Sequence, residues 1–262
     1  GTQSVTITIT DNESAPTVTL TRGASAIDED SSSTVTITAT LSNATYQDVT
    51  VTIDGTGGTG TEGTDFGTVS NITISAGATT GTAAVDPTDD SVYEGNETAG
   101  ISISGVSGGG ASENGTQAVT ITITDNESAP TLTLSTSASS IAENAGTSLT
   151  LTATLSNGTY QDVTAALGTS GTATEGTDYT DGSGSIDDIT ISAGATTGTV
   201  SFTPTNDSIV EANETAIIAV TGVSGGSATE SGSQSQTITI TNDDSSNFSV
   251  ANVTVDEDAG TA

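Results

Sequence analysis

The chain has 262 residues, a formal net charge of −32 and one basic side chain, Arg22. With so little positive charge it cannot bind nucleic acid by neutralising phosphates. The absence of Lys, His and Cys removes the usual catalytic bases and nucleophiles, so we do not expect an enzyme. The sequence also has no apolar run of about 18 residues, so we expect no membrane insertion in this window.

Internal repetition organises the sequence. The opening GTQSVTITITDNE (residues 1–13) returns as GTQAVTITITDNE (residues 115–127), and ITISAGATTGT occurs at both 72–82 and 189–199. The final FSVANVTVDEDAGTA resembles the start of each copy. We therefore expect a window from a longer tandem array. Its parts are a last strand of one repeat (1–13), repeat one (14–127), repeat two (128–244) and a first strand of another repeat (245–262).

Apolar residues alternate with Thr and other polar residues at a period of two, which is typical of strands with one buried face. In repeat one the alternation predicts about seven strands, marked by Val18–Leu20, Val35–Leu41, Val49–Ile53, Ile72–Ile74, Ala83–Val85, Ile101–Ile103 and Val119–Ile123. Repeat two repeats the pattern. The fold class we predict is all-β, with tandem seven-stranded antiparallel Ig-like (Greek-key) β-sandwiches.

The connections between repeats are short. Each reads DNESAP, at residues 11–16 and 125–130, and the proline holds the preceding residue in an extended conformation. A linker of this kind favours a stiff string of domains over a flexible one.

Acidic residues gather at predicted strand ends. The loop from Asp89 to Glu97 holds four carboxylates in nine residues, and its copy holds Asn206, Asp207, Glu211 and Glu214. Such groups repel one another unless a cation lies among them, and this chain has almost no cationic side chains. Oxygen-only ligands without His or Cys select hard cations, and flexible loops favour calcium over magnesium.

Four motifs in the same order in each repeat resemble the Calx-beta domain family. They are GTEGTDF and ATEGTDY, ITISAG, TDDSVYEGNET and TNDSIVEANET, and the endings ITITDNE and ITITNDD. The resemblance implies a sandwich that binds calcium at one pole. Its implied ligands are Glu29, Asp65, Asp89, Asp90, Glu94 and Asp125 in repeat one, and Glu143, Asp178, Asp207, Glu211, Asp243 and Asp244 in repeat two.

The two copies depart from a fully acidic pattern. Asn206 replaces an Asp of the loop, and Asn126 and Asn242 interrupt the terminal acidic run. Fewer charges imply weaker binding or fewer ions. Glu97 and Glu214 are interpreted as structural residues that begin the sixth strand. The alternative for the whole set is that these acids are solvated turns that keep the sheet edges unpaired.

The favoured function is a structural repeat segment of a calcium-stiffened extracellular or cell-surface stalk, fibre or adhesin. The partners expected are neighbouring repeats of the same chain, with end-to-end assembly into a fibre as a further possibility. One form of that assembly is strand addition by the terminal strands. The alternatives are an adhesive module that binds a glycan or protein, and a calcium-sensing regulatory domain.

Overall fold

The computed structural model describes residues 1–252 and residue 257, and the chain divides into two compact units, 1–129 and 130–262. The described residues form strands, turns and loops, with no helix long and apolar enough to cross a membrane. Residues 1–13 and 245–252 form no strand. Most of the remainder of the expected trailing strand, 253–256 and 258–262, lies outside the described residues.

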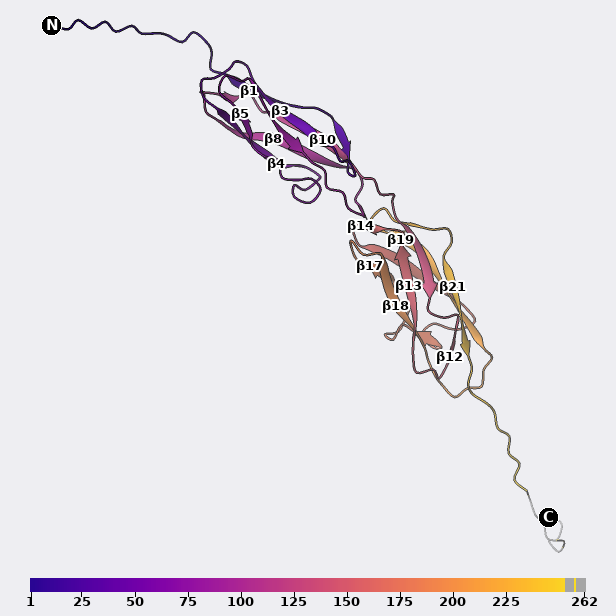
Figure 1. The fold of residues 1–262 in the computed structure, drawn as a ribbon. Coiled ribbons are helices and arrows are strands. Elements are labelled where there is room, and N and C mark those ends of the chain that lie inside the picture. Colours follow the sequence, from indigo (N-terminus) through magenta and orange to yellow (C-terminus); the bar gives the residue numbers. More distant parts are fainter. Residues whose placement is uncertain (253–256, 258–262) are drawn as a thin grey trace. The chain divides into compact units, whose positions relative to one another are not determined.

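Repeat one is a two-sheet sandwich (Figure 1). One sheet has four strands in the order β6-β3-β1-β9, and the other has five in the order β2-β10-β8-β4-β5. The strands are β1 (Thr17–Arg22), β2 (Ala26–Asp28), β3 (Val35–Leu41), β4 (Val49–Gly58), β5 (Ile72–Ile74), β6 (Thr80–Val85), β8 (Glu97–Ser107), β9 (Ser112–Glu113) and β10 (Ala118–Thr124). A short strand, β7 (Val92–Tyr93), lies in the loop between β6 and β8.

Repeat two has the same architecture. Its sheets run β16-β18-β13-β11-β20 and β12-β21-β19-β15-β17. The strands are β11 (Thr131–Thr136), β12 (Ser140–Ala142), β13 (Leu149–Leu155), β15 (Val163–Gly171), β16 (Tyr179–Thr180), β17 (Ile189–Ile191), β18 (Thr197–Pro204), β19 (Glu214–Ser224), β20 (Thr229–Glu230) and β21 (Ser235–Thr241). The short strand β14 (Gly158–Thr159) follows β13.

The alternation of apolar and polar residues determines which strand residues form the core. In β3 the residues Val35, Ile37, Ala39 and Leu41 are buried while the threonines between them are more exposed. The inward faces of both sheets of repeat one form a single apolar cluster, and repeat two has its own. Most core residues are small or medium in size. In repeat two the aromatic rings of Tyr179 and Phe202 stack with their centroids 4.7 Å apart.

The long strands are antiparallel, and short edge strands add parallel pairs that the alternation did not predict. After β1 the chain bends and crosses to the other sheet, where β2 runs parallel to β10 with Asp28 opposite Thr124. In repeat two β12 runs parallel to β21 in the same way. This crossing delivers the residue after β2 to the end of the last strand, where the acidic residues gather.

Candidate metal centres

The ends of β2, β8 and β10 meet at one pole of repeat one. The Glu29 N–H donates to the Thr124 carbonyl at 3.0 Å, which continues the β2–β10 pairing by one residue and sets Glu29 beside Asp125. Glu97, the first residue of β8, lies opposite Ile123 of β10. The ends of these three strands therefore bring acidic side chains to this pole, and the loops add further ones.

Two groups of three carboxylates result. We name Glu29, Asp125 and Glu127 the strand-end cluster, and Asp65, Glu94 and Glu97 the loop cluster. Within each cluster, one carboxylate oxygen from each residue lies within 4.8 Å of the others. Glu29 is buried, with 6% of its surface exposed, which is rare for a carboxylate that has no cationic partner.

The loop between β6 and β8 is fastened to these side chains through its backbone. The Asp90 N–H donates to Glu29 Oε1 at 3.1 Å, and the Glu94 and Gly95 N–H groups donate to Asp125 Oδ2 at 2.9 and 2.5 Å. Hydrogen bonds from backbone N–H to a carboxylate fix its orientation. The acidic side chains are thus held by the loop that supplies further acids.

Asp65 comes from a tight loop after β4. Its Oδ2 accepts from the Thr61 N–H at 2.5 Å, and its carbonyl accepts from the Thr88 N–H at 3.0 Å. Gly58 makes the approach of this loop possible, because it has φ +98° and a Cβ there would lie 2.1 Å from the Thr98 carbonyl oxygen. The close contact between β4 and β8 carries Asp65 to Glu97.

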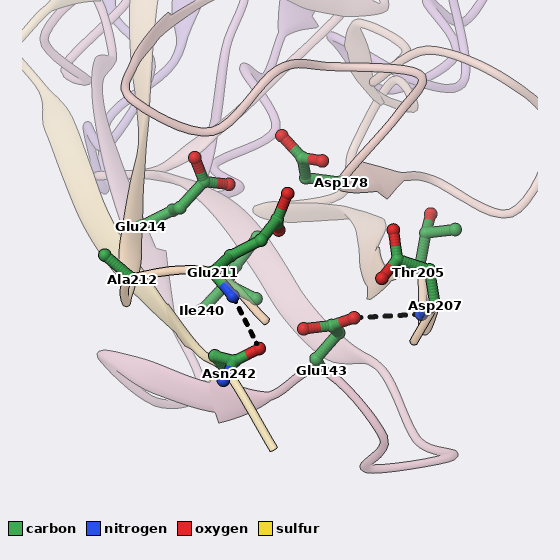
Figure 2. Close-up of a pocket in the computed structure, with 9 residues that line it drawn as sticks. All are labelled: Glu143, Asp178, Thr205, Asp207, Glu211, Ala212, Glu214, Ile240 and Asn242. Carbon is green, nitrogen blue, oxygen red and sulfur yellow. Dashed lines mark hydrogen bonds between the residues drawn. The ribbon is translucent and has the colours of Figure 1, made fainter. Parts of the chain in front are cut away.

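Repeat two builds the same pole (Figure 2). Its loop cluster is Asp178, Glu211 and Glu214, and its strand-end cluster is Glu143, Asp207 and Asp244. The Asp207 N–H donates to Glu143 Oε1 at 2.9 Å, and the Thr174 N–H donates to Asp178 Oδ2 at 2.6 Å. Gly171, with φ +119°, repeats the close approach seen at Gly58.

A small polar pocket lies among these side chains of repeat two. Its volume is about 10 Å³ and its lining includes Glu143, Asp178, Asp207, Glu211 and Glu214. In Figure 2 the carboxylates of these residues converge around a common space. A volume of this size accepts about one water-sized sphere, which is the scale of a single ion rather than an organic ligand.

An amide replaces a carboxylate at the end of the last strand in repeat two. Asn242 stands where repeat one has Asp125, and its Oδ1 accepts from the Glu211 N–H at 3.3 Å. The loop that carries Glu211 is therefore still held to the end of the last strand by a hydrogen bond, although the amide of Asn242 carries no negative charge. The third member of the strand-end cluster in repeat two is Asp207, whose counterpart Asp90 lies next to Glu29 in repeat one.

The carboxylates of repeat one repel one another. Burial raises the pKa of Glu29 and of Glu94, and the charges of neighbouring acids raise both further. Desolvation, together with a hydrogen bond to Asp65, raises the pKa of Glu97 to about 7. Desolvation and a hydrogen bond to Asp125 raise the pKa of Glu127 to about 7. Two acids in this pole thus resist ionisation near neutral pH.

Repeat two shows the same direction of change. Desolvation, followed by the charges of Asp207 and Asp178, raises the pKa of Glu211. Desolvation and the charge of Asp178 raise the pKa of Glu214. In addition, Asp244 Oδ2 is buried and has no hydrogen-bond partner in the described structure. A buried carboxylate oxygen without a partner is costly unless a cation or another group satisfies it.

The donor set fits calcium. Calcium takes six to eight oxygen ligands at about 2.3–2.6 Å, so two oxygens on one ion lie at most about 5 Å apart. The 4.8 Å limit that each cluster satisfies agrees with that span. Each pole therefore offers two places where three carboxylates could share an ion, and the remaining ligands would be backbone carbonyls or water.

The structure brings together most of the residues implied by the family resemblance. Glu29, Asp65, Glu94 and Asp125 lie in the clusters of repeat one, and Glu143, Asp178, Asp207, Glu211 and Asp244 lie in those of repeat two. Asp90 contacts Glu29 through its backbone. Asp89 and Asp243 are exposed and belong to neither cluster, and Asp243 accepts a hydrogen bond from Asn144 Nδ2.

Three cluster members were not among the ligands implied by the sequence: Glu97, Glu214 and Glu127. Glu97 and Glu214 do begin β8 and β19, as the strand pattern indicates, and they also face the loop cluster. Glu127 is reached by a turn in which its N–H donates to Asp125 Oδ1 at 2.8 Å. The spacing between copies was an available signal, since Glu127 and Asp244 end the equivalent DNE and NDD motifs.

Family models match each repeat. Residues 125–245 match the model described as Calx-beta domain, and residues 15–126 match the model described as LapA domain. The motifs of both repeats resemble the Calx-beta family, whereas the Calx-beta model matches repeat two and the LapA model matches repeat one. No match was found among curated proteins.

Solved structures give low similarity scores. The crystal structure of CBD12 from CALX1.2 has 15% sequence identity and a TM-score of 0.39, and the match covers 86% of this chain and 99% of that one. The calcium binding domain CBD12 of CALX1.1 has 14% identity and a TM-score of 0.36, with 82% and 96% covered. The apo-form Calx CBD1 domain has 18% identity and a TM-score of 0.36, with 42% and 99% covered.

The two units share their strand order except for the additional edge strand β16 of repeat two, and each has two clusters of acidic side chains at one pole. The Calx-beta domain model thus matches residues 125–245, and the LapA domain model matches residues 15–126, a unit with a similar sandwich and acidic pole.

Proposed function

We propose that each repeat binds calcium at its acidic pole and that the chain is a structural repeat segment of an extracellular stalk, fibre or adhesin. The observation that carries the calcium proposal is the pair of three-carboxylate clusters in each repeat, built by equivalent residues except for Asp125 and Asp207, in a chain with one basic side chain. The match of residues 125–245 to the Calx-beta domain model supports it.

The covalent path of the chain supports a stiffening role. Asp125 and Glu127 belong to the strand-end cluster of repeat one, and only Ser128, Ala129 and Pro130 separate Glu127 from the start of β11. An ion held by these two carboxylates would fix the backbone at the point where it leaves repeat one. The freedom of the linker would then depend on calcium occupancy.

The surroundings expected for such a segment are extracellular. Modules outside the cell bind calcium at roughly 10⁻⁴ to 10⁻³ M, and a chain with net charge −32 attracts soluble cations rather than anionic surfaces. The partners proposed are neighbouring repeats of the same chain. A structural role for the ion also accounts for a pattern that is repeated in both units.

The stiffening proposal is tested by a distance distribution between the two repeats. The chain has no Cys, so probes attached at Ala44→Cys and Ser185→Cys, both at exposed positions, report only that distance. We expect the distribution to narrow when calcium replaces a chelator. Asp125→Asn with Glu127→Gln should remove the narrowing.

A matched control keeps the number of altered charges the same. Asp178→Asn with Glu211→Gln changes two carboxylates of repeat two, which do not adjoin the linker between the repeats in sequence, and should leave the narrowing intact. A distribution of equal width with and without calcium would contradict the stiffening role. That outcome would leave calcium binding itself to be judged by the stability measurement described in the Discussion.

A further inference from the structure

The loop that carries Asp65 holds a further acid, Glu62, which belongs to neither cluster. This loop comprises residues 59–71, between β4 and β5. Glu62 is half-buried, and its Oε1 accepts from the Val69 N–H at 2.6 Å. Because Val69 lies only three residues before β5, this hydrogen bond joins the beginning of the loop to its end.

Strand β4 leaves space for the Glu62 carboxylate. At Gly55 a Cβ would lie 2.9 Å from Glu62 Cδ and 3.0 Å from both carboxylate oxygens. The carboxylate therefore lies against the backbone of β4 while it accepts from the segment that leads into β5. We name this arrangement, Glu62 with Gly55 and Val69, the loop clamp. Phe66, inside the clamped segment, is 0% exposed, so this segment also contributes a side chain to the core.

Repeat two keeps the loop clamp although its loop is longer. Glu175 Oε1 accepts from the Ile186 N–H at 2.5 Å, and Ile186 also lies three residues before the next strand, β17. The two bonded residues are eleven positions apart, against seven in repeat one. A second donor holds this carboxylate, since Thr169 Oγ1 of β15 donates to Glu175 Oε2 at 2.7 Å. The contact is thus retained while the length of the loop changes, which indicates that it fixes the point where the loop returns.

The loop clamp connects Asp65 to the strands of the pole. Within the turn, the Asp65 N–H donates to the Thr61 carbonyl at 2.9 Å, and the Thr88 N–H holds Asp65 to the next loop. The clamp adds a contact with β4, and β4 pairs with β8, whose first residue is Glu97. Glu62 therefore contributes to the position of Asp65 relative to Glu97, its partner in the loop cluster.

This contact matters most in the absence of calcium. The carboxylates of the loop cluster lie close together and repel one another, which favours states in which the loop of Asp65 has moved away from Glu97. A site that is formed only part of the time binds its ligand more weakly, in proportion to the fraction of time that it is formed. A residue that keeps the loop in place thus raises the affinity of the site without contacting the ion.

We propose that Glu62 and Glu175 are positioning residues, which hold the loops of Asp65 and Asp178 in their ligand-holding positions before calcium binds. Each acts through the backbone of its loop and not as a ligand. The inference rests on the proposed function, because calcium binding is what the loop clamp strengthens. It assigns a role to the glutamate of the TEGTD motif in each repeat, which neither cluster uses.

The test uses the 262-residue chain with the loop cluster of repeat two disabled by Asp178→Asn and Glu211→Gln, so that the loop cluster left to bind calcium is that of repeat one. Glu62→Ala should weaken calcium binding on the order of tenfold, the factor by which loss of a hydrogen bond to a charged acceptor changes such an equilibrium. Glu62→Gln should stay within about twofold of the parent chain, because its amide oxygen still accepts from the Val69 N–H. Isothermal titration measures both affinities.

Glu113→Ala is the matched control. Glu113 Oε1 also accepts from a backbone N–H, that of Gln117 at 2.5 Å, but it precedes β10, whose other end reaches the acidic pole. Its loss should leave the calcium affinity unchanged. Gly55→Ala displaces the clamp while every acid stays in place, and the fold is kept because the Glu62 carboxylate ends a flexible side chain that can move aside. This variant should weaken calcium binding as Glu62→Ala does.

Two results would overturn the positioning role. If Glu62→Gln weakened calcium binding as much as Glu62→Ala, the carboxylate would act as a ligand or through its charge. If Glu62→Ala lowered the unfolding midpoint in a chelator but left the calcium affinity unchanged, the loop clamp would serve the fold alone.

Hydrogen exchange in a chelator separates this inference from the proposed function. The Gly63, Thr64 and Asp65 N–H groups are hydrogen-bonded within the loop. They should exchange faster in Glu62→Ala than in the parent chain or in Glu62→Gln, because the loop opens more often. Equal exchange in all three chains would overturn the loop clamp, whatever calcium does. A parent chain that bound no calcium, with exchange still faster in Glu62→Ala, would contradict the proposed function and overturn the link between the clamp and affinity.

Discussion

The two acidic poles are built on one plan and differ chiefly in charge. Both have a loop cluster of one Asp and two Glu at equivalent positions. In the strand-end cluster, repeat one uses Asp125 where repeat two has Asn242, and the amide still accepts a hydrogen bond from the loop. The comparison shows that the fastening of the loop needs only an oxygen at this position, whereas ion affinity depends on whether that oxygen is charged.

The largest effect expected comes from removing two members of one loop cluster. Asp65→Asn with Glu94→Gln should abolish most of the calcium-induced stabilisation of repeat one and leave that of repeat two unchanged. Asp178→Asn with Glu211→Gln should do the reverse. An asparagine can still accept the hydrogen bond from the Thr61 or Thr174 N–H, so the fold is retained. Calorimetric unfolding with and without calcium measures both transitions.

The magnitude follows from linkage. A ligand at a hundred times its Kd stabilises a fold by about 2.7 kcal/mol per site, which shifts the midpoint of a domain of this size by roughly 10 °C or more. Asp86→Asn, an exposed residue outside the clusters of repeat one, is the matched control and should keep the full shift. Loss of stabilisation in both repeats from either double variant would show that the two poles are not independent.

Substitutions at the equivalent positions 125 and 242 should change the calcium affinities of the two repeats in opposite directions. Asn242→Asp adds a carboxylate to the pole of repeat two, and Asp125→Asn removes one from repeat one. We expect the first to tighten and the second to weaken calcium binding on the order of tenfold, or about 1.4 kcal/mol. Isothermal titration, with the loop cluster of the other repeat disabled, measures each value. Unchanged affinities would mean that this position serves only to fasten the loop.

The pH dependence of the calcium-free protein should be steeper in repeat one. The pKa of Glu97 is about 7 in the folded state, against 4.5 as its ordinary value. The folded state therefore binds the proton more tightly than the unfolded state. The resulting stability is fully present below pH 4.5 and is lost as the pH rises through 7.

We expect Glu97→Gln to flatten this dependence, since its amide does not ionise. Glu214→Gln should have the corresponding effect in repeat two, where the pKa of Glu214 is also raised. Unfolding midpoints measured in a chelator between pH 4 and 8 test this. Calcium should reverse the trend, because it requires the ionised carboxylates. If the unfolding midpoint of repeat one rose with pH in the chelator, that result would contradict the conclusion that the acids of this pole are crowded and uncompensated.

The smallest effect should come from acids outside the clusters. Asp89 is exposed, and its counterpart in repeat two is already an amide, Asn206. Asp89→Asn should change calcium affinity less than about twofold and stability by less than about 0.5 kcal/mol. A loss as large as that expected for Asp125→Asn would place Asp89 among the ligands in the calcium-bound state, as the family resemblance implies.

The sequence predicts the fold better than it predicts the membership of the clusters. Alternation at Val35–Leu41 or Val119–Ile123 marks strands because one face is buried. It cannot show that β2 crosses to pair with β10, because a three-residue strand has too few residues to display a period. That crossing is what brings Glu29 to Asp125.

The site residues that the sequence did not identify have a similar explanation. Glu97 sits at the first position of a strand, where a solvated acid and a ligand look alike in sequence. Asp243 and Asp244 are adjacent, and only the direction of the backbone after β21 decides that Asp244 enters the cluster. Side-chain direction at a strand end depends on tertiary contacts, which the local pattern does not encode.

The central claim is that the acids at each pole converge on an ion in the folded state. Calorimetric unfolding of the 262-residue chain across a calcium titration, with magnesium and a chelator as controls, tests it most directly. We predict that both transitions rise with calcium, that repeat one rises at lower calcium than repeat two, and that magnesium has a smaller effect. Two transitions that do not respond to calcium would mean that the clusters are solvated turns and would contradict the claim.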